Sequence, residues 1–311
     1  MNTTPSFTHT LRQRWQAADS MLCVGLDPDP ARIPAHLGTG PEAIDRFCRD
    51  IIAATADTVC AFKPQIAYFA AQGAEDVLTG LIAHIHAEHP GIPVILDAKR
   101  GDIGSTARQY GVEAFDRFKA DALTLSPFMG FDSIEPYFEW AGRGLILLCR
   151  TSNPGGNDLQ ALSVLPAGDT TGTPPGAPSP RQSASDAASS AQPEKLYEHL
   201  ARLAAGPWNV NGELGLVVGA TFPDELARVR ALAPRLPLLV PGVGAQGGDV
   251  NATVRAGLDA DGYGLVINSS RAILYAGKGT DFADQARKAA VATRDAIRAA
   301  RDAARMRALR A

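Results

Sequence analysis

The sequence predicts an α/β fold of the (β/α)8 barrel class, in which eight parallel strands alternate with helices. Three observations support this fold. Short apolar runs alternate with longer amphipathic segments, eight such runs can be counted, and nearly every run has polar residues at its C-terminal end. A length of 311 residues is long for one ordinary domain, but it suits one barrel domain over 1–311 that carries an insertion.

Continuous apolar runs are typical of parallel strands that are buried on both faces. The predicted strands cover 22–27, 59–64, 93–99, 122–128, 144–151, 214–220, 237–243 and 262–268. The amphipathic segments between them predict helices over 42–56, 68–88, 104–118, 222–233 and 249–258. An open doubly wound sheet is the competing architecture, but the first strand lacks the G-x-G-x-x-G motif that would follow it in such a fold.

Two segments differ from this pattern. The span 161–195 is rich in proline, glycine and serine and has almost no apolar content after Leu165. Such a composition buries too little surface to order itself, so we expect a low-complexity, disordered insertion after the fifth strand. Residues 281–311 predict an Arg/Ala-rich C-terminal helix, in which interspersed aspartates favour a solvated face over an anion-binding arm.

Composition excludes several functional classes. A formal net charge of -3 argues against a nucleic-acid partner. No apolar stretch reaches the length of a membrane helix, and the N-terminus lacks an apolar signal core, so no membrane partner is expected. The four cysteines are scattered without a C-x-x-C pair, which indicates free thiols and a cytoplasmic location. His84, His86 and His89 lack an acidic partner set, so no metal site is predicted there.

The densest group of charges follows the third predicted strand. Asp97 and Lys99 alternate along that strand and should point to the same side, and Asp102 follows across a glycine. Lys63 ends the neighbouring second strand and would add another ammonium group. These residues predict an array of alternating charges at the rim where barrel enzymes place their active sites. The simpler alternative is a strand-end salt bridge that caps the next helix.

Two further loops have the composition of a phosphate site. Residues 241–249, which are rich in glycine, follow the seventh strand and open a helix, and residues 267–271 follow the eighth. Barrel enzymes often bind phosphate between these loops with backbone N–H groups, and Arg271 would add charged hydrogen bonds. Asp27, at the end of the first strand, either forms an Asx turn before proline or accepts hydrogen bonds from a polar ligand.

These residues together resemble a known family. The pattern Asp97-x-Lys99-x-x-Asp102-Ile103-x-x-Thr106 resembles the signature of the orotidine 5′-phosphate decarboxylases, in particular a longer bacterial subgroup. The resemblance covers about residues 20–280. Features of the same family follow in the same order: Asp27 in Gly-Leu-Asp, Lys63 in Phe-Lys-Pro, the loop that begins at Pro241, and Asn268-Ser-Ser-Arg271.

The resemblance implies decarboxylation of orotidine 5′-phosphate to UMP without a metal or an organic cofactor. It implies that Lys99 delivers a proton to C6 of the pyrimidine and that Asp97, Lys63 and Asp102 complete the charged array. It also implies a homodimer in which Asp102 and Thr106 reach the site of the neighbouring subunit. The expected substrate-binding residues are Asp27 and Lys63 on the ribose, Ser152 on the pyrimidine, Gln246 and Arg271 on the phosphate, and Ile103, Pro241 and Gly247.

Two alternatives remain open. A magnesium-dependent sugar-phosphate decarboxylase or synthase of the same barrel superfamily shares the D-x-K-x-x-D arrangement. Those relatives carry an acidic metal ligand where this chain has Lys63. A non-catalytic phosphate-binding barrel is the other alternative, but it would have no need for the charged cluster around Asp97.

Overall fold

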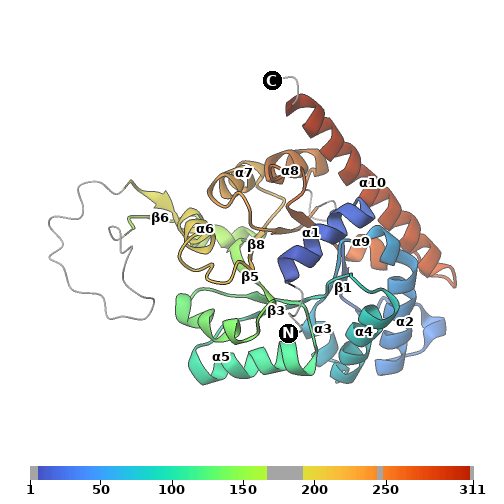
Figure 1. Ribbon diagram of the computed structural model, residues 1–311. Coiled ribbons are helices and arrows are strands. Elements are labelled where there is room, and N and C mark those ends of the chain that lie inside the picture. Colours follow the sequence, from blue (N-terminus) through green and yellow to red (C-terminus); the bar gives the residue numbers. More distant parts are fainter. Residues whose placement is uncertain (1–5, 167–191, 244–247, 309–311) are drawn as a thin grey trace.

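In the computed structural model, which describes residues 6–166, 192–243 and 248–308, eight parallel strands form one sheet surrounded by helices (Figure 1). The predicted barrel is confirmed, and each strand falls within or close to a predicted run. The strands are β1 (Leu22–Leu26), β2 (Ala61–Pro64), β3 (Ile95–Arg100), β4 (Ala122–Leu125), β5 (Gly144–Arg150), β8 (Leu214–Val218), β9 (Leu238–Pro241) and β10 (Leu265–Ser269).

The strand order is β2-β1-β10-β9-β8-β5-β4-β3, so β2 and β3 are the two ends of the sheet. Two isolated parallel bridges, Phe62↔Val94 and Gln65↔Asp97, join these ends and nearly close the circle. We call this junction the β2–β3 seam. The order brings the C-terminal ends of all eight strands to one rim, where the polar strand ends of the sequence gather.

Helices cover the outside of the barrel, and the buried apolar side chains form one cluster that joins strands to helices. The α-helices that follow the strands are α2 (Gly40–Thr55), α3 (Ile66–Ala70), α4 (Glu75–Glu88), α5 (Gly104–Gly111), α6 (Leu196–Ala205), α7 (Pro223–Leu232), α8 (Val250–Gly257) and α9 (Arg271–Leu274). Shorter helical segments are η1 (Ala35–Leu37), η2 (Ala56–Thr58), η3 (Val112–Arg117), η4 (Phe131–Ser133), η5 (Glu135–Glu139) and η6 (Pro154–Asp158).

The prediction of one helix over 68–88 is wrong, because two helices occupy this region. The break coincides with Gly73, whose φ of +59° is left-handed and ends the first helix. The amide of Ala74 donates to the carbonyl of Phe69 across this turn. The second helix then begins at Glu75 with two acidic residues in its first turn, which favours a helix N-terminus.

The sequence interpretation missed α1 (Phe7–Ala18), which lies across the N-terminal end of the barrel (Figure 1). Ser6 caps this helix by accepting a hydrogen bond from the amide of His9. Phe7, Leu11 and Trp15 stand four residues apart, so they share one face, and that face is fully buried. The helix therefore closes the end of the barrel opposite the rim of polar strand ends.

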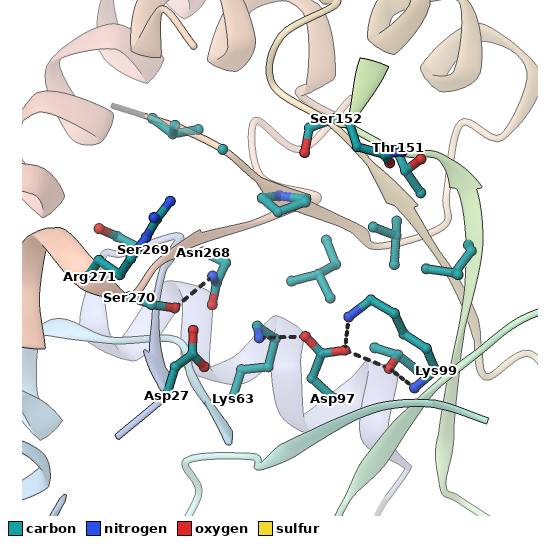
Figure 2. A pocket seen from close by; sticks show the side chains of 18 of the residues that line it. Asp27, Lys63, Asp97, Lys99, Thr151, Ser152, Asn268, Ser269, Ser270 and Arg271 are labelled. Carbon is teal, nitrogen blue, oxygen red and sulfur yellow. Dashed lines mark hydrogen bonds and ion pairs between the residues drawn. The ribbon is translucent and has the colours of Figure 1, made fainter. Parts of the chain in front are cut away.

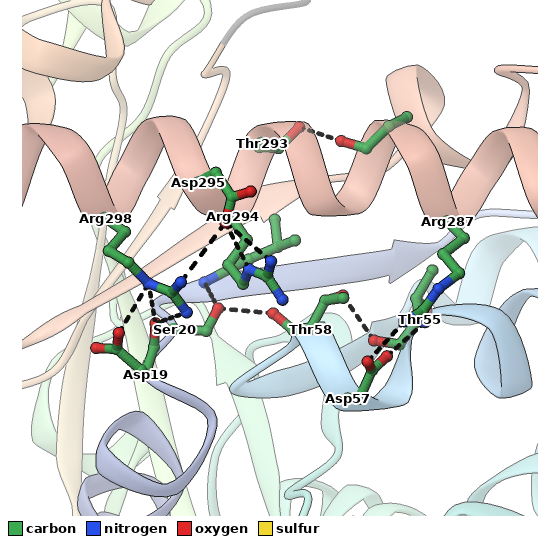
Figure 3. A network of polar contacts seen from close by, with 12 residues as sticks. Asp19, Ser20, Thr55, Asp57, Thr58, Arg287, Thr293, Arg294, Asp295 and Arg298 are labelled. Atoms are coloured by element: carbon green, nitrogen blue, oxygen red, sulfur yellow. Dashed lines mark hydrogen bonds and ion pairs between the residues drawn. The ribbon is translucent and has the colours of Figure 1, made fainter.

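The C-terminal helix α10 (Phe282–Ala308) is confirmed, but its basic face is not simply solvated. It packs against α2, α8 and β1. Arg301 is buried and ion-paired with Asp19, which Arg298 also contacts at 2.8 Å. Arg287 forms a bidentate pair with Asp57 (Figure 3). These arginines therefore fasten the helix to the segments before β1 and β2.

The predicted insertion 161–195 is ordered at both ends, which corrects its predicted boundaries. β6 (Ser163–Val164) and β7 (Glu194–Lys195) pair in antiparallel fashion, with Val164 opposite Glu194. Glu194 is buried and pairs with His199 and Arg202 of the next helix. The centre of the insertion, 167–191, lies outside the described residues. No helix among the described residues is long and apolar enough to cross a membrane.

Candidate active site

A cavity of about 500 Å³ opens at the C-terminal rim of the barrel. Figure 2 shows charged side chains from β2 and β3 facing polar side chains that follow β5 and β10 across it. The predicted site residues that line this cavity are Asp27, Lys63, Asp97, Lys99, Ser152, Pro241 and Arg271. Residues distant in the sequence meet here because parallel strands bring their C-terminal ends to one side.

One carboxylate lies between two ammonium groups at the centre of the site. Asp97 accepts from Lys63 Nζ at 2.8 Å through Oδ2 and from Lys99 Nζ at 2.6 Å through Oδ1 (Figure 2). Lys63 and Asp97 are buried, whereas the side chain of Lys99 is 45% exposed and extends over the cavity. Lys99 is therefore held by an ion pair with Asp97, while its side chain remains accessible to a ligand in the cavity.

Burial and charge act against each other in this array. Burial disfavours the ionised form of Asp97, but the attraction of Lys63 and Lys99 and the hydrogen bonds from both outweigh it, so the pKa of Asp97 lies well below its ordinary range. Burial likewise opposes the charge on Lys63, but Asp97 and Asp27 raise its pKa above the ordinary value. Both groups are therefore charged at neutral pH.

The backbone of β3 is irregular where it presents these side chains. The β3–β4 register shifts between Leu96 and Arg100, and Lys99 has a left-handed φ of +47°. The hydroxyl of Thr124 on β4 accepts from the amides of Ala98 at 3.0 Å and Lys99 at 2.9 Å. It donates to Asp97 Oδ1 at 2.9 Å. The simple strand alternation assumed for Asp97 and Lys99 thus breaks down, although their side chains still meet.

The wall of the cavity next to Lys63 carries two acceptors that have no partner in the described residues. Asp27 Oδ1 and Asn268 Oδ1 are both buried in this way, and both residues line the cavity. A Cβ on Gly25 would lie 1.9 Å from Ser270 Oγ, so glycine is required where β1 passes beneath the loop after β10. Buried acceptors are costly unless they are paired, so this wall suits the hydroxyl groups of a ligand.

Tyr275 connects the two loops that form this wall. Its hydroxyl donates to the carbonyl of Asp27 at 2.7 Å and accepts from the amide of Asp29 at 2.6 Å. Tyr275 follows α9, the short helix that begins with the exposed Arg271. The loop of Asp27 is therefore tied directly to the segment that carries the predicted phosphate-binding arginine.

The loop that carries Ser152 is fixed by Arg150, the last residue of β5. Its guanidinium is 1% exposed, pairs with Glu225 of α7 and donates to Asn157 Oδ1 at 2.5 Å. Gln160 accepts from the amide of Thr151 at 2.8 Å. These contacts hold the chain on both sides of Ser152 and direct this loop toward the cavity.

Several predicted residues do not reach the cavity within one chain. Asp102, Ile103 and Thr106 do not line it, because the chain leaves the barrel after β3. Asp102 accepts from the amide of Ile103 at 2.9 Å, and α5 has no side-chain cap. The expectation that Asp102 joins Asp97 and Lys99 in one chain is therefore wrong, and so is the helix-cap alternative. Gln246 and Gly247 lie outside the described residues.

The predicted site left out several polar residues that line the cavity: Thr124, Thr151, Asn153, Gln160, Asn268, Ser269 and Ser270. Thr124 is the polar residue within the β4 sequence Ala-Leu-Thr-Leu, a signal that alternation toward the barrel interior could have identified. Ser126, the next polar residue in the sequence, comes directly after β4 and does not line the cavity. Among the described residues, no group of three or more His, Cys, Asp or Glu side chains could hold a metal ion.

Comparison with known proteins gives the family. A curated orotidine 5′-phosphate decarboxylase from Azoarcus sp. is 63% identical over 95% of this chain and 99% of its own length. The chain belongs to the orotidine 5′-phosphate decarboxylase family. A decarboxylase of the same name from Dechloromonas aromatica is 60% identical over 94% of the chain and 98% of its own length. A family model described as "Orotidine 5'-phosphate decarboxylase / HUMPS family" matches residues 20–171.

Solved structures of the decarboxylase family agree with this assignment. The OMP decarboxylase of Leishmania donovani has a TM-score of 0.75 and 40% identity, covering 95% of this chain and 98% of that one. A putative orotidine-monophosphate-decarboxylase from Toxoplasma gondii has a TM-score of 0.80 and 34% identity, covering 96% and 97%. The chain therefore shares the fold of these decarboxylases over nearly its whole length.

Proposed function

We propose that this protein decarboxylates orotidine 5′-phosphate to UMP and CO2 in pyrimidine biosynthesis, with Lys99 as the proton donor. The observation that carries the proposal is the buried Asp97 carboxylate held between the ammonium groups of Lys63 and Lys99 at the floor of the rim cavity. The membership of the chain in the decarboxylase family supports the same activity.

The reaction needs a cation fixed beside the reacting carbon. When the bond from C6 to the carboxylate breaks, CO2 leaves and its electron pair stays on C6. The Lys99 ammonium stabilises this carbanion and then gives it a proton, which leaves a neutral amine that solvent reprotonates. A charge that is already oriented costs little reorganisation when the carbanion forms, and this is why a fixed ammonium is more effective than water.

The remaining cavity residues suit the rest of the substrate. Asp27 and Lys63 suit the ribose hydroxyls, since Asp27 Oδ1 is buried without a hydrogen-bond partner among the described residues. Ser152 follows β5 on a loop held by Arg150 and suits the pyrimidine. Arg271, with Pro241 and the loop of Gln246 and Gly247, suits the phosphate. Binding energy from the phosphate, far from C6, can then support the chemical step.

Asp102, Ile103 and Thr106 fit a homodimeric enzyme. Ile103 is 49% exposed and Thr106 is exposed on α5, so both are open to a second subunit. In this arrangement Asp102 and Thr106 of one subunit complete the cavity of the other, and the array gains its second carboxylate. The enzyme would act in the cytoplasm, in agreement with four cysteines that are all buried and free.

Lys63 disfavours the magnesium-dependent alternative. Its ammonium lies 2.8 Å from Asp97 and occupies the place where those enzymes need an acidic ligand. A divalent cation beside this ammonium would be repelled, and the buried Asp97 carboxylate already has two cationic partners.

The test is the loss of orotidine 5′-phosphate absorbance on mixing with purified enzyme in EDTA. We expect turnover by the wild type and by Lys288→Ala, which removes an exposed lysine of α10. Lys99→Ala should lower kcat by at least about 10³-fold with an unchanged circular dichroism spectrum. An inactive wild type, or turnover that requires added magnesium, would contradict the proposed function. Near-normal activity of Lys99→Ala would contradict the role of Lys99.

A further inference from the structure

Thr124 occupies the point where the β3 ladder is interrupted. Between Leu96 and Arg100 the register with β4 shifts, so the amides of Ala98 and Lys99 are not paired in the strand ladder. Both amides donate to the Thr124 hydroxyl instead, at 3.0 and 2.9 Å. Thr124 is 1% exposed, so its hydroxyl is shielded from solvent.

The hydrogen-bonding capacity of this hydroxyl is fully used by the protein. A threonine hydroxyl has one proton and two acceptor positions. The two acceptor positions receive the amides of Ala98 and Lys99, so the proton is directed to Asp97 Oδ1 at 2.9 Å. The same Asp97 oxygen accepts from the Lys99 ammonium at 2.6 Å. Thr124 therefore has no capacity left to bind the substrate by a hydrogen bond, although it lines the cavity.

We propose that Thr124 is a positioning residue that fixes both ends of Lys99, its backbone through the amide and its ammonium through Asp97. This inference rests on the proposed role of Lys99 as proton donor. The left-handed backbone of Lys99, at φ +47°, is unfavourable for a residue with a side chain and persists only where surrounding contacts impose it. Thr124 supplies two of these contacts through one atom.

Loss of the hydroxyl should therefore affect the chemical step more than binding. Without it, the Lys99 amide is unpaired and the backbone can relax toward an extended conformation, which moves the side chain. Asp97 also loses one of the two hydrogen bonds that orient Oδ1. A displacement of about 1 Å in a reacting group can cost about 100-fold in rate, whereas the ribose and phosphate contacts do not involve Thr124.

The experiment compares Thr124→Val, which keeps the shape and removes the hydroxyl, with Thr124→Ser, which keeps the hydroxyl. The matched control is Thr253→Val in α8, because Thr253 is fully buried and its hydroxyl has no partner in the described residues. For each variant, kcat and KM are measured with orotidine 5′-phosphate, and the Kd of UMP is measured by calorimetry. Urea unfolding shows whether each variant is folded, and Thr124→Ala replaces the valine variant if that one does not fold.

We expect Thr124→Val to lower kcat by about 10- to 100-fold while the Kd of UMP changes less than about twofold. Thr124→Ser should recover kcat to within about threefold of the wild type, and Thr253→Val should be unchanged. A folded Thr124→Val enzyme with normal kcat would overturn the inference. So would an effect confined to KM, or an equal loss in the serine variant. An inactive wild type would instead refute the proposed function.

Discussion

Replacing Asp97 with asparagine removes the negative charge between two ammonium groups and preserves the size of the side chain. The nearest consequence falls on Lys63, which is 4% exposed and would keep a buried charge without its partner at 2.8 Å. Lys99 is affected less, because its side chain is 45% exposed and water can solvate it. The perturbation therefore tests whether the array stabilises the folded protein as well as the proposed reaction.

The expected magnitude follows from the distance and the burial. At an effective dielectric constant of about 20, unit charges 2.8 Å apart attract by about 6 kcal/mol before the cost of desolvation. Removing one partner of a buried pair typically costs about 3–5 kcal/mol. We expect Asp97→Asn to lower the free energy of unfolding at pH 7 by about 3 kcal/mol, at the lower end of this range because the Asp27 carboxylate still attracts Lys63.

A double-mutant cycle in urea separates the pair from its surroundings. Lys63→Met removes the buried ammonium and leaves Asp97 with Lys99 and Thr124. In the double variant neither Asp97 nor Lys63 remains as a charge without the other, so the two losses should not add. We expect a coupling free energy of about 1–3 kcal/mol between Asp97 and Lys63. Additive losses, or an Asp97→Asn protein as stable as the wild type, would refute the reasoning.

The pH dependence gives an independent check on the same pair. The pKa of Asp97 is lowered on folding from an ordinary value of 3.8. Its stabilising contribution is therefore complete above that value and is lost as the pH falls toward the folded pKa. The difference in unfolding free energy between wild type and Asp97→Asn should be constant from about pH 8 to 5 and shrink below about pH 4. A difference that grows on acidification would contradict the assigned sign.

Two further predictions concern the loops around the cavity. Replacing 165–193 with Asn-Gly would join Val164 to Glu194 by a two-residue hairpin turn. The kcat/KM of this variant should stay within about twofold of the wild type, because neither β6 nor β7 lines the cavity. A folded but inactive variant would show that the insertion takes part in turnover. Tyr275→Phe removes the hydroxyl that joins Asp27 to Asp29 through two hydrogen bonds. KM should rise about fivefold, which corresponds to about 1 kcal/mol of lost binding energy, whereas the exposed Tyr68→Phe should have no effect. A fall in kcat without a change in KM would contradict this role.

The barrel could be predicted because each strand is a local signal. An apolar run such as 93–96 is readable without knowledge of its neighbours, and parallel strands then imply a common rim for Lys63, Asp97 and Lys99. Helix α1 escaped prediction because polar residues surround its three buried positions, Phe7, Leu11 and Trp15. These three positions can be recognised as a buried face only once the helix is packed against the end of the barrel.

The fine structure of the site could not be predicted in the same way. The role of Thr124 depends on a register shift between β3 and β4. No sequence pattern within either strand indicates that shift. The left-handed conformation of Lys99 depends on the same pairing. Asp102 shows a different limit. Its separation of three residues suggested proximity to Lys99, but the chain leaves the barrel after β3. Among the described residues of one chain, the hydrogen bond of its carboxylate is to the amide of Ile103.

The β2–β3 seam links the charged array to the motions of the barrel. Single backbone bridges close the sheet there, whereas neighbouring strands elsewhere share ladders. The Lys63–Asp97 ion pair spans this seam, so it links two strands that are joined by isolated bridges instead of a continuous ladder. Local opening at this junction would separate the two charges and dismantle the reaction centre before the rest of the fold is disturbed. Slow amide hydrogen exchange at Phe62, whose N–H donates across the seam to Pro93, would therefore report how often the enzyme is assembled for turnover.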